Sequence, residues 1–210
     1  RVYTKMPYPE CPNLRVRYLG TAGFVFEAND HTIVVDPYVS RPSTWDTATK
    51  PLQPDASRIQ SYTPRADTVL VGHSHHDHVL DAPELCLQTG ATLLGSASTA
   101  NVARSAGVPE SQIKIVSAHQ PISCGPHTVR ALPSIHGKVF MGRVLFPGHI
   151  KKVPQWPMRI WNFRHGEVLN WHLTMNGVSV VHIDSADFIE DHLKDAQADI
   201  LCLCAAGRQY

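Results

Sequence analysis

The residues of this chain that could do chemistry are concentrated in one short segment. Residues 73–78 read His-Ser-His-His-Asp-His, so four of the 13 histidines of the chain lie here beside one aspartate. Imidazole and carboxylate groups suit zinc, iron(II) or manganese better than copper(I). The alternating side chains of His73 and His75 can converge on one ion, while Asp77 and His78 turn toward a neighbouring one. The segment therefore predicts a metal site with ligands for two ions.

Two such ions would have a definite chemical use. Divalent metals a few ångströms apart can share a bridging water and lower its pKa into the neutral range. His76 has no ligand role in this pattern, and we expect it to be exposed or packed. A histidine-rich surface loop is the alternative interpretation of the segment. The buried strand that the sequence predicts directly before it argues against that alternative.

The elements before the metal segment are predicted to be strands. The run Thr68–Gly72 is continuously apolar, which is typical of a strand buried on both faces. Upstream, residues 14–19, 24–28 and 32–36 have strand composition, and Asn29-Asp30 is a turn pair, so the opening reads as an antiparallel meander. The metal segment is then expected on a loop at the carboxyl end of a buried strand.

The rest of the chain alternates between helical and strand patterns. From Val39 to Pro64 it is polar and proline-rich, and we expect a long surface segment there that could border a site. Asn176-Gly177 is the strongest hairpin signal. Helices are expected at 81–88, 98–105 and 189–194, and strands at 91–94, 112–116, 128–131, 169–174, 178–183 and 200–204. This order predicts an α/β domain with helices packed on its sheets.

Length and composition set limits on the class of protein. The chain has 210 residues, 43% of them hydrophobic, which suffices for a full core in one domain. A net charge of +1 argues against a strongly basic nucleic-acid binder, and no apolar run approaches the ~20 residues of a membrane span. The five cysteines form no CxxC pair, which favours reduced thiols and a cytoplasmic location. Because the chain begins at Arg1, a processed or trimmed N-terminus is compatible with it.

The metal segment belongs to a wider pattern that resembles a known family. Its His-x-His-x-Asp-His string, together with Leu19–Phe24 and Ile33–Pro37, resembles the metallo-β-lactamase-fold superfamily, in particular its lactonase-like and phosphodiesterase-like metal-dependent hydrolases. The matching residues run from about 16 to 204. The resemblance implies an αββα four-layer sandwich over residues 1–210.

The resemblance also implies a ligand set. A first site would be formed by His73, His75 and His136, and a second by Asp77 and His78, with Asp184 shared between them. Asp77 would also act catalytically, as a proton acceptor. Two divalent ions are implied, with zinc expected and with manganese and iron as alternatives.

Two residues near the ligands have open interpretations. Asp36 resembles the family aspartate that supports the metal loop by holding a ligand histidine, but it could also be a simple turn-former before Pro37. His182 lies two positions before Asp184 on the same predicted strand, where it could support a ligand or face solvent.

One family element is missing from the printed sequence. The family closes its second site with a histidine on a loop after the strand that here reads 200–204, but no histidine follows His192. We expect a truncated C-terminal end, so that the fold lacks its last strand and helix. An incomplete second site, or a partner chain that completes it, are the alternatives.

A basic and aromatic stretch could receive the substrate. Residues 137–167 form a possible insertion or lid between two predicted ligands, and they supply the candidate substrate-binding residues His149, Lys151, Lys152, Arg159 and Trp161. Such a lid would favour an anionic small molecule. Tryptophan and arginine are also enriched at interfaces, so a homo-oligomer contact is the alternative, and single-stranded nucleic acid is disfavoured by the low net charge.

The sequence therefore predicts a metal-dependent hydrolase that attacks an ester, lactone, amide or phosphodiester with a metal-activated hydroxide. An iron-dependent oxidoreductase of the same fold, such as a sulfur dioxygenase, is a rival that metal identity and oxygen uptake would distinguish. A non-catalytic metal-binding domain with an incomplete second site is the other alternative.

Overall fold

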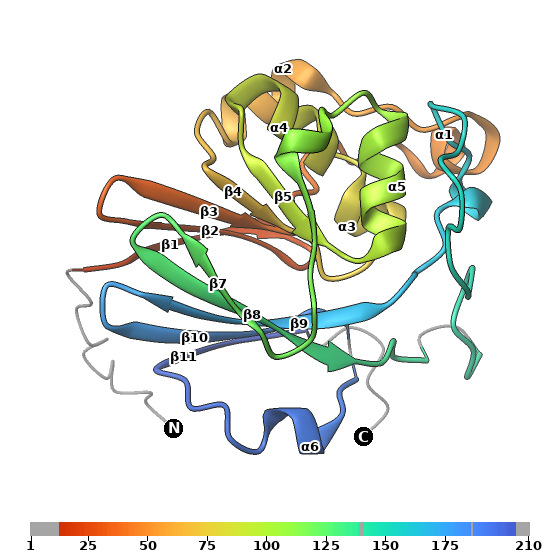
Figure 1. The fold of residues 1–210 in the computed structure, drawn as a ribbon. Helices are drawn as coiled ribbons and strands as arrows, with labels where there is room; N and C mark the ends of the chain where they lie inside the picture. The colour runs from red at the N-terminus through yellow and green to blue at the C-terminus, as the bar shows by residue number, and fades with distance from the viewer. Residues whose placement is uncertain (1–12, 139–140, 186, 205–210) are drawn as a thin grey trace, which may run out of the picture.

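Two β-sheets packed face to face form the centre of the fold. The computed structural model describes residues 13–138, 141–185 and 187–204. The first sheet has the order β1-β2-β3-β4-β5-β6 and the second has the order β11-β10-β9-β8-β7 (Figure 1). The first sheet contains β1 (Arg15–Gly20), β2 (Gly23–Ala28), β3 (His31–Val35), β4 (Thr68–Leu70), β5 (Thr92–Gly95) and β6 (Ile113–Ile115). The second contains β7 (Pro121–Cys124), β8 (His127–Ser134), β9 (Val168–Met175), β10 (Val178–Ile183) and β11 (Ile200–Leu203).

Tight turns build the antiparallel halves of both sheets. Asn29 and Asp30 have φ values of 48° and 57°, and Asn176 and Gly177 have φ values of 48° and 82°. Consecutive positive φ values are those of the type I′ turn, whose twist matches the strands that it joins. The meander β1-β2-β3 and the hairpin β9-β10 are thus confirmed as the sequence predicts them.

The other half of the first sheet is parallel. Strands β3 to β6 run in one direction, and helices α4 (Ala82–Thr89) and α5 (Ala97–Ser105) lie in the connections between them. Ser96 caps α5 by accepting the Thr99 N–H at 3.2 Å. Since parallel strands bring their carboxyl ends to one edge, the segment after β4 lies at that edge.

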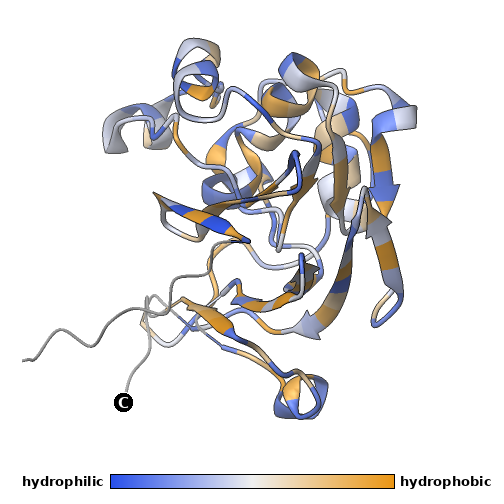
Figure 2. Ribbon diagram, turned by 90° about the vertical axis from the view of Figure 1, so that its left-hand side faces the viewer, coloured by the Kyte–Doolittle hydropathy of each residue, from blue (hydrophilic) through white to orange (hydrophobic). Residues whose placement is uncertain are grey.

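Strand β4 is buried on both faces, as its composition predicts. Val69 belongs to the core between the first sheet and its helices, and Leu70 belongs to the core between the two sheets. Phe26 and Trp171 fill the inter-sheet core from opposite sides. The strands of both sheets carry hydrophobic residues along their length (Figure 2). The metal segment therefore starts from a strand held rigidly by two cores.

Helices complete the four layers. Helices α2 (Ala56–Tyr62), α4 and α5 lie over the first sheet, and α6 (Glu190–Leu193) lies beneath the second (Figure 1). Within the described residues, α6 is the helix on that outer face, so the fourth layer is thin there. The αββα arrangement is confirmed. Residues 205–210, on which the expected missing last strand and helix depend, lie outside the described residues.

The expectation of a surface segment from Val39 to Pro64 is wrong in part. This stretch forms α1 (Thr44–Thr49) and α2, and the side chains of Leu52 and Ile59 are 1% and 0% exposed. The polar composition of the stretch does not predict the burial of Leu52 and Ile59, because each of them lies among polar neighbours in the sequence. A further short helix, α3 (His76–Val79), begins inside the metal segment itself.

Two other expectations concern thiols and membranes. Among the described cysteines, Cys86, Cys124 and Cys202 are buried and Cys204 is half-buried, and all four are free thiols; Cys11 lies outside the described residues. The described helices include none with the length and apolar character needed to cross a membrane.

The inter-sheet core yields a stability prediction. Trp171 is fully buried in this core, whereas Trp45 is 72% exposed on α1. Trp171→Ala should lower the free energy of unfolding by about 3–5 kcal/mol because it leaves a large cavity. Trp45→Ala, the matched control, should change it by about 0.5 kcal/mol or less. Urea unfolding followed by circular dichroism measures both, and equal effects would contradict this account of the core.

Candidate metal centre

Strand ends from both sheets deliver the predicted ligands to one place. His73 and His75 follow β4, His136 follows β8, and Asp184 follows β10. The two sheets thus contribute to one cluster at their common edge. The sequence alone could not show this convergence, because 111 residues separate His73 from Asp184.

The first group of side chains is made of three histidines. Ligand atoms of His73, His75 and His136 lie within 4.8 Å of one another. The Nε2 atom of His73 is 3.0 Å from Nδ1 of His75. His136 donates its Nδ1–H to the Gly137 carbonyl at 2.7 Å, which leaves Nε2 with its lone pair. This is the arrangement expected of neutral imidazoles that face a metal ion.

The second group shares His73 with the first. His73, His78 and Asp184 also bring ligand atoms within 4.8 Å of one another. The carboxylate of Asp184 lies 2.5 Å from His73 Nδ1 and 2.8 Å from His78 Nδ1. Burial alone would raise the pKa of Asp184, but the charge of His78 holds the pKa below its usual value. Burial would lower the pKa of His78, but the carboxylates of Asp184, Asp77 and Asp36 raise it well above its usual value.

Asp77 lies beside the second group, on its more exposed side. Its Oδ2 is 3.8 Å from Nε2 of His78, and its side chain is 37% exposed. This separation is short enough for both atoms to bind one ion at about 2.0–2.2 Å. Nδ1 of His78 faces the buried carboxylates of Asp36 and Asp184, so Nε2 is the nitrogen toward Asp77. The place of Asp77 in the second site stays a prediction.

Asp36 performs both tasks considered for it. Its φ of 44° makes it a turn residue after β3, and its carboxylate is fully buried. Oδ1 accepts the Gly72 N–H at 2.7 Å and Oδ2 lies 3.1 Å from His78 Nδ1. Burial and the neighbouring charge of Asp184 raise the pKa of Asp36 to about 6. Asp36 thereby holds the start of the metal segment and one of its imidazoles.

Backbone space at Gly72 is a requirement that sequence reasoning missed. A Cβ atom at Gly72 would lie 2.3 Å from Cγ of Asp184, so only glycine admits this carboxylate. Asn170 on β9 adds a second constraint, since its Oδ1 accepts the Asp184 N–H at 3.1 Å. Ser185 accepts the Gly137 N–H at 3.1 Å and so fixes the loop that carries His136.

The donor set fits a metal. His75 Nε2 is buried without a hydrogen-bond partner, and Asp184 Oδ1 lies near His78 outside hydrogen-bond geometry. Burial lowers the pKa of His73 and His136, and that of His75 to about 4. These imidazoles are therefore neutral at pH 7 and can donate lone pairs. Buried atoms without partners carry a desolvation cost that coordination would remove.

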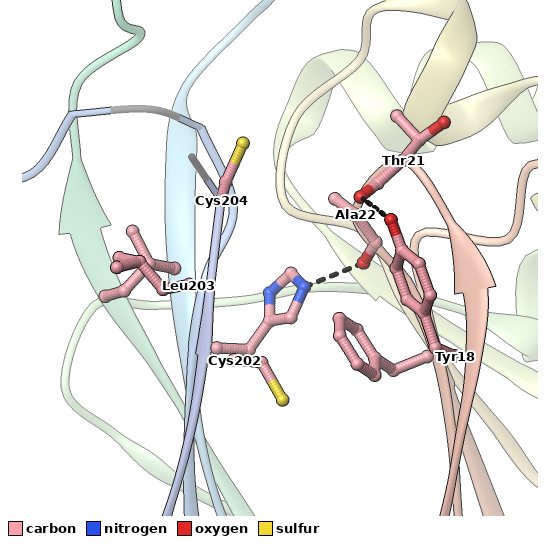
Figure 3. A pocket seen from close by; sticks show the side chains of 9 residues that line it. Tyr18, Thr21, Ala22, Cys202, Leu203 and Cys204 are labelled. Atoms are coloured by element: carbon pink, nitrogen blue, oxygen red, sulfur yellow. Dashed lines mark hydrogen bonds between the residues drawn. The ribbon is translucent and has the colours of Figure 1, made fainter. Parts of the chain in front are cut away.

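His182 is buried, not exposed to solvent. Its side chain is 1% exposed, and its Nε2–H is donated to the Ala22 carbonyl at 2.8 Å. Figure 3 shows the pocket beside it, where Thr21 and Ala22 face Cys202 and Cys204 across the gap between the sheets. This hydrogen bond fastens His182, which lies on β10 two positions before Asp184, to the turn between β1 and β2.

Other histidines pack around the cluster. The His76 ring meets Tyr38 and Phe163 edge-on, with centroids 5.8 and 6.3 Å away, in agreement with the packing role expected for it. His165, which has no sequence motif, lies 5.9 Å from His75 and 6.1 Å from His136 between ring centroids. No sequence signal could have placed His165 here.

The cavity over the cluster has an apolar roof. A cavity of about 320 Å³ is lined by members of both groups, namely His75, His78, His136 and Asp184, and by Leu145, Phe146 and Ile160 from the segment 137–167. Two hydrogen bonds hold this segment against the metal loop. Ser74 donates its N–H to the His165 carbonyl and its Oγ–H to the Arg164 carbonyl. The described part of the segment therefore borders the cluster, and residues 139–140 lie outside the description.

The five predicted substrate residues lie elsewhere. His149, Lys151, Lys152, Arg159 and Trp161 are exposed, and none of them lines this cavity. Arg159 stacks over the Trp161 ring at 5.3 Å and donates to the Thr49 carbonyl. The same segment thus faces the cluster with its apolar residues and faces away with its charged ones.

Gly72 yields a prediction about metal affinity. Gly72→Ala should weaken metal binding about 10–100-fold, the loss usual when a partner of a ligand is disturbed, because the new Cβ displaces Asp184. Gly107→Ala is the matched control. Open space surrounds Gly107, so the substitution should cost only the strain of its φ of 90°, about 1–2 kcal/mol in the free energy of unfolding, and should leave the metal affinity unchanged. Zinc titration by calorimetry measures both, and equal affinities would refute the argument.

Known proteins share sequence similarity with this chain. The family model described as the β-lactamase superfamily domain matches residues 15–210. A metal-dependent hydrolase of Methanopyrus kandleri is 36% identical over 95 residues, which are 45% of this chain and 36% of that protein. One of Pyrobaculum arsenaticum is 26% identical over 124 residues, covering 59% of this chain and 51% of the relative. The chain therefore spans at most about half the length of these relatives.

Solved structures share the fold at low sequence identity. A metallo hydrolase of Ignicoccus hospitalis matches with a TM-score of 0.51 at 17% identity, covering 80% of this chain and 59% of that one. A metallo-β-lactamase of Cronobacter sakazakii matches with a TM-score of 0.51 at 14% identity, covering 90% of this chain and 74% of the other. With two facing sheets, a histidine cluster at their edge and a family match over nearly its full length, the chain belongs to the β-lactamase superfamily domain family.

Proposed function

We propose that this chain carries the catalytic centre of a metal-dependent hydrolase with two divalent ions. The observation that carries the proposal is the convergence of two groups of ligand atoms at one edge of the sheets, joined by the contact of His73 Nδ1 with the Asp184 carboxylate. Relatives named metal-dependent hydrolases support the reaction class. Since the chain spans only part of those relatives, the activity is a proposal for this chain.

The proposed ligands divide as follows. His73, His75 and His136 would hold one ion, and Asp77, His78 and Asp184 would hold the other. Divalent ions at such sites supply an activated hydroxide and polarise the scissile oxygen. Nitrogen and carboxylate donors favour zinc, with manganese and iron as alternatives.

Asp77 is proposed as the proton acceptor. Burial alone would raise the pKa of its carboxyl, but the neighbouring His78 and His76 hold the pKa well below its usual value. Asp77 is therefore ionised at neutral pH. Because it lines the cavity and is partly exposed, its carboxylate can accept a proton from a group bound there.

The substrate is proposed to be a small molecule with an ester, lactone, amide or phosphodiester bond. The anionic character predicted from Lys151, Lys152 and Arg159 receives no support from the cavity, whose lid residues are apolar. A cytoplasmic location and a homo-oligomer stay predictions. The histidine that the family adds to its second site has no counterpart after His192 in the printed sequence, so this ligand stays unassigned.

Metal content tests the ligand assignment. His73→Ala should lower the metal bound per chain, because the first group loses one of its three imidazole ligands. His76→Ala is the matched control: it removes an adjacent histidine that belongs to neither group, so the metal content should not change. Plasma mass spectrometry of the dialysed proteins measures both. An unchanged metal content in His73→Ala would remove the basis of the proposal.

Hydrolysis tests the reaction class. The zinc- or manganese-loaded protein should cleave p-nitrophenyl esters, lactones or bis-p-nitrophenyl phosphate, and both a chelator and Asp184→Ala should abolish turnover while the circular dichroism spectrum stays folded. One tightly bound iron per chain, with oxygen uptake and no hydrolysis, would instead favour the oxidoreductase alternative.

A further inference from the structure

A second cavity opens beside the metal cluster. It has a volume of about 640 Å³, within the usual range of small-molecule sites. We call it the side pocket and define it by six aliphatic residues that line it: Ile115, Val116, Ile135, Val144, Val168 and Leu169. Five of them lie at the end of β6, directly after β8 and at the start of β9, and Val144 belongs to the segment 137–167.

The side pocket reaches the metal cluster through His136. This residue lines the side pocket and also lines the cavity over the cluster. The two cavities are therefore neighbours that share His136 as a wall, so a ligand held in the side pocket lies beside one of the proposed metal ligands.

The polar side chains of the side pocket already have partners inside the protein. Ser96 caps α5, and Ser134 donates its hydroxyl to the Asp187 carbonyl at 3.2 Å. His165 donates Nδ1–H to the Gly166 carbonyl at 2.5 Å, and its Nε2 accepts the Gly148 N–H at 3.3 Å. What these walls offer to a ligand is therefore mainly carbon, since the hydrogen-bonding atoms are engaged.

The charge of the side pocket disfavours anions. Among the described residues that line it, none is a lysine or arginine, and Glu167 contributes a carboxylate. A carboxylate or phosphate placed there would lose hydration and meet a like charge. A neutral apolar chain pays neither cost and gains the burial of its methylene groups.

We infer that the side pocket binds the alkyl or acyl chain of a neutral substrate, whose scissile bond then lies beside His136. The position of the scissile bond rests on the proposed function, whereas the preference for neutral alkyl chains rests on the side pocket alone. The inference replaces an anionic substrate by one whose affinity grows with chain length.

Binding of straight-chain alcohols to the purified chain tests this preference. Each added methylene between 1-butanol and 1-octanol should lower the Kd about fourfold, the factor that ~0.8 kcal/mol per buried CH₂ gives. Alkanoates of the same length should bind at least about tenfold more weakly. Titration followed by NMR chemical shifts measures both series. A Kd that does not depend on chain length, or tighter binding of the alkanoates, would overturn the inference.

Exposed variants locate the binding. Ile115 and Ile135 are 49% and 45% exposed, so Ile115→Asp and Ile135→Asp should leave the protein folded and abolish the dependence on chain length. Leu87→Asp, on α4 with 44% exposure, is the matched control and should bind octanol like the unmodified chain. Equal losses in all three variants would place the binding elsewhere.

A charge reversal tests the exclusion of anions. Glu167→Lys should tighten octanoate binding about tenfold relative to octanol, since it replaces the repelling carboxylate by a cation. Glu190→Lys on α6, outside the side pocket, should leave the ratio of the two affinities unchanged. The inference fails if both variants shift the ratio equally or if neither does.

Hydrolysis separates this inference from the proposed function. Length-dependent alcohol binding without cleavage of any ester, lactone, amide or phosphodiester would refute the hydrolase and leave the side pocket assigned. The opposite result would be cleavage with a kcat/KM that does not depend on acyl chain length, together with no alcohol binding. It would refute the binding role of the side pocket and leave the proposed hydrolase supported.

Discussion

The buried carboxylate of Asp184 is the contact on which the cluster depends. It lies fully buried between His73 and His78, where an isolated charge would be costly. Three features of the chain hold it in place: the absence of a side chain at Gly72, the neighbouring imidazoles, and Asn170, whose amide oxygen accepts the backbone N–H of Asp184. Because these features come from β4, β9 and β10, the contact joins both sheets at their common edge.

Strand rigidity gives this contact its precision. Strand β4 is held between two cores, so the segment that follows it starts from a fixed point. Asp36 then ties the first amide of the loop, at Gly72, to the His78 ring. Groups that must converge within a few tenths of an ångström are better placed on such rigid elements than on free loops. The metal chemistry proposed here therefore depends on packing far from the ligands themselves.

The segment 137–167, which borders the cluster, places apolar and charged side chains on opposite sides. Leu145, Phe146 and Ile160 face the cavity, whereas the cations at 151, 152 and 159 face solvent. Apolar walls also line the side pocket on the other side of His136. Exclusion of water around the cluster strengthens every electrostatic interaction inside it. Neutral substrates with an apolar chain match both cavities, which links the proposed reaction to the proposed substrate class.

The sequence by itself determined the local features. The turns at 29–30 and 176–177, the doubly buried strand β4 and the density of histidines after it are all written in neighbouring residues, and the resemblance then supplied His136 and Asp184. Only the packing of distant elements brings His73 against Asp184, places His165 beside His75 and buries Leu52 and Ile59. The physical reason is that periodicity reports which face of an element is buried, whereas convergence of side chains depends on how distant elements pack.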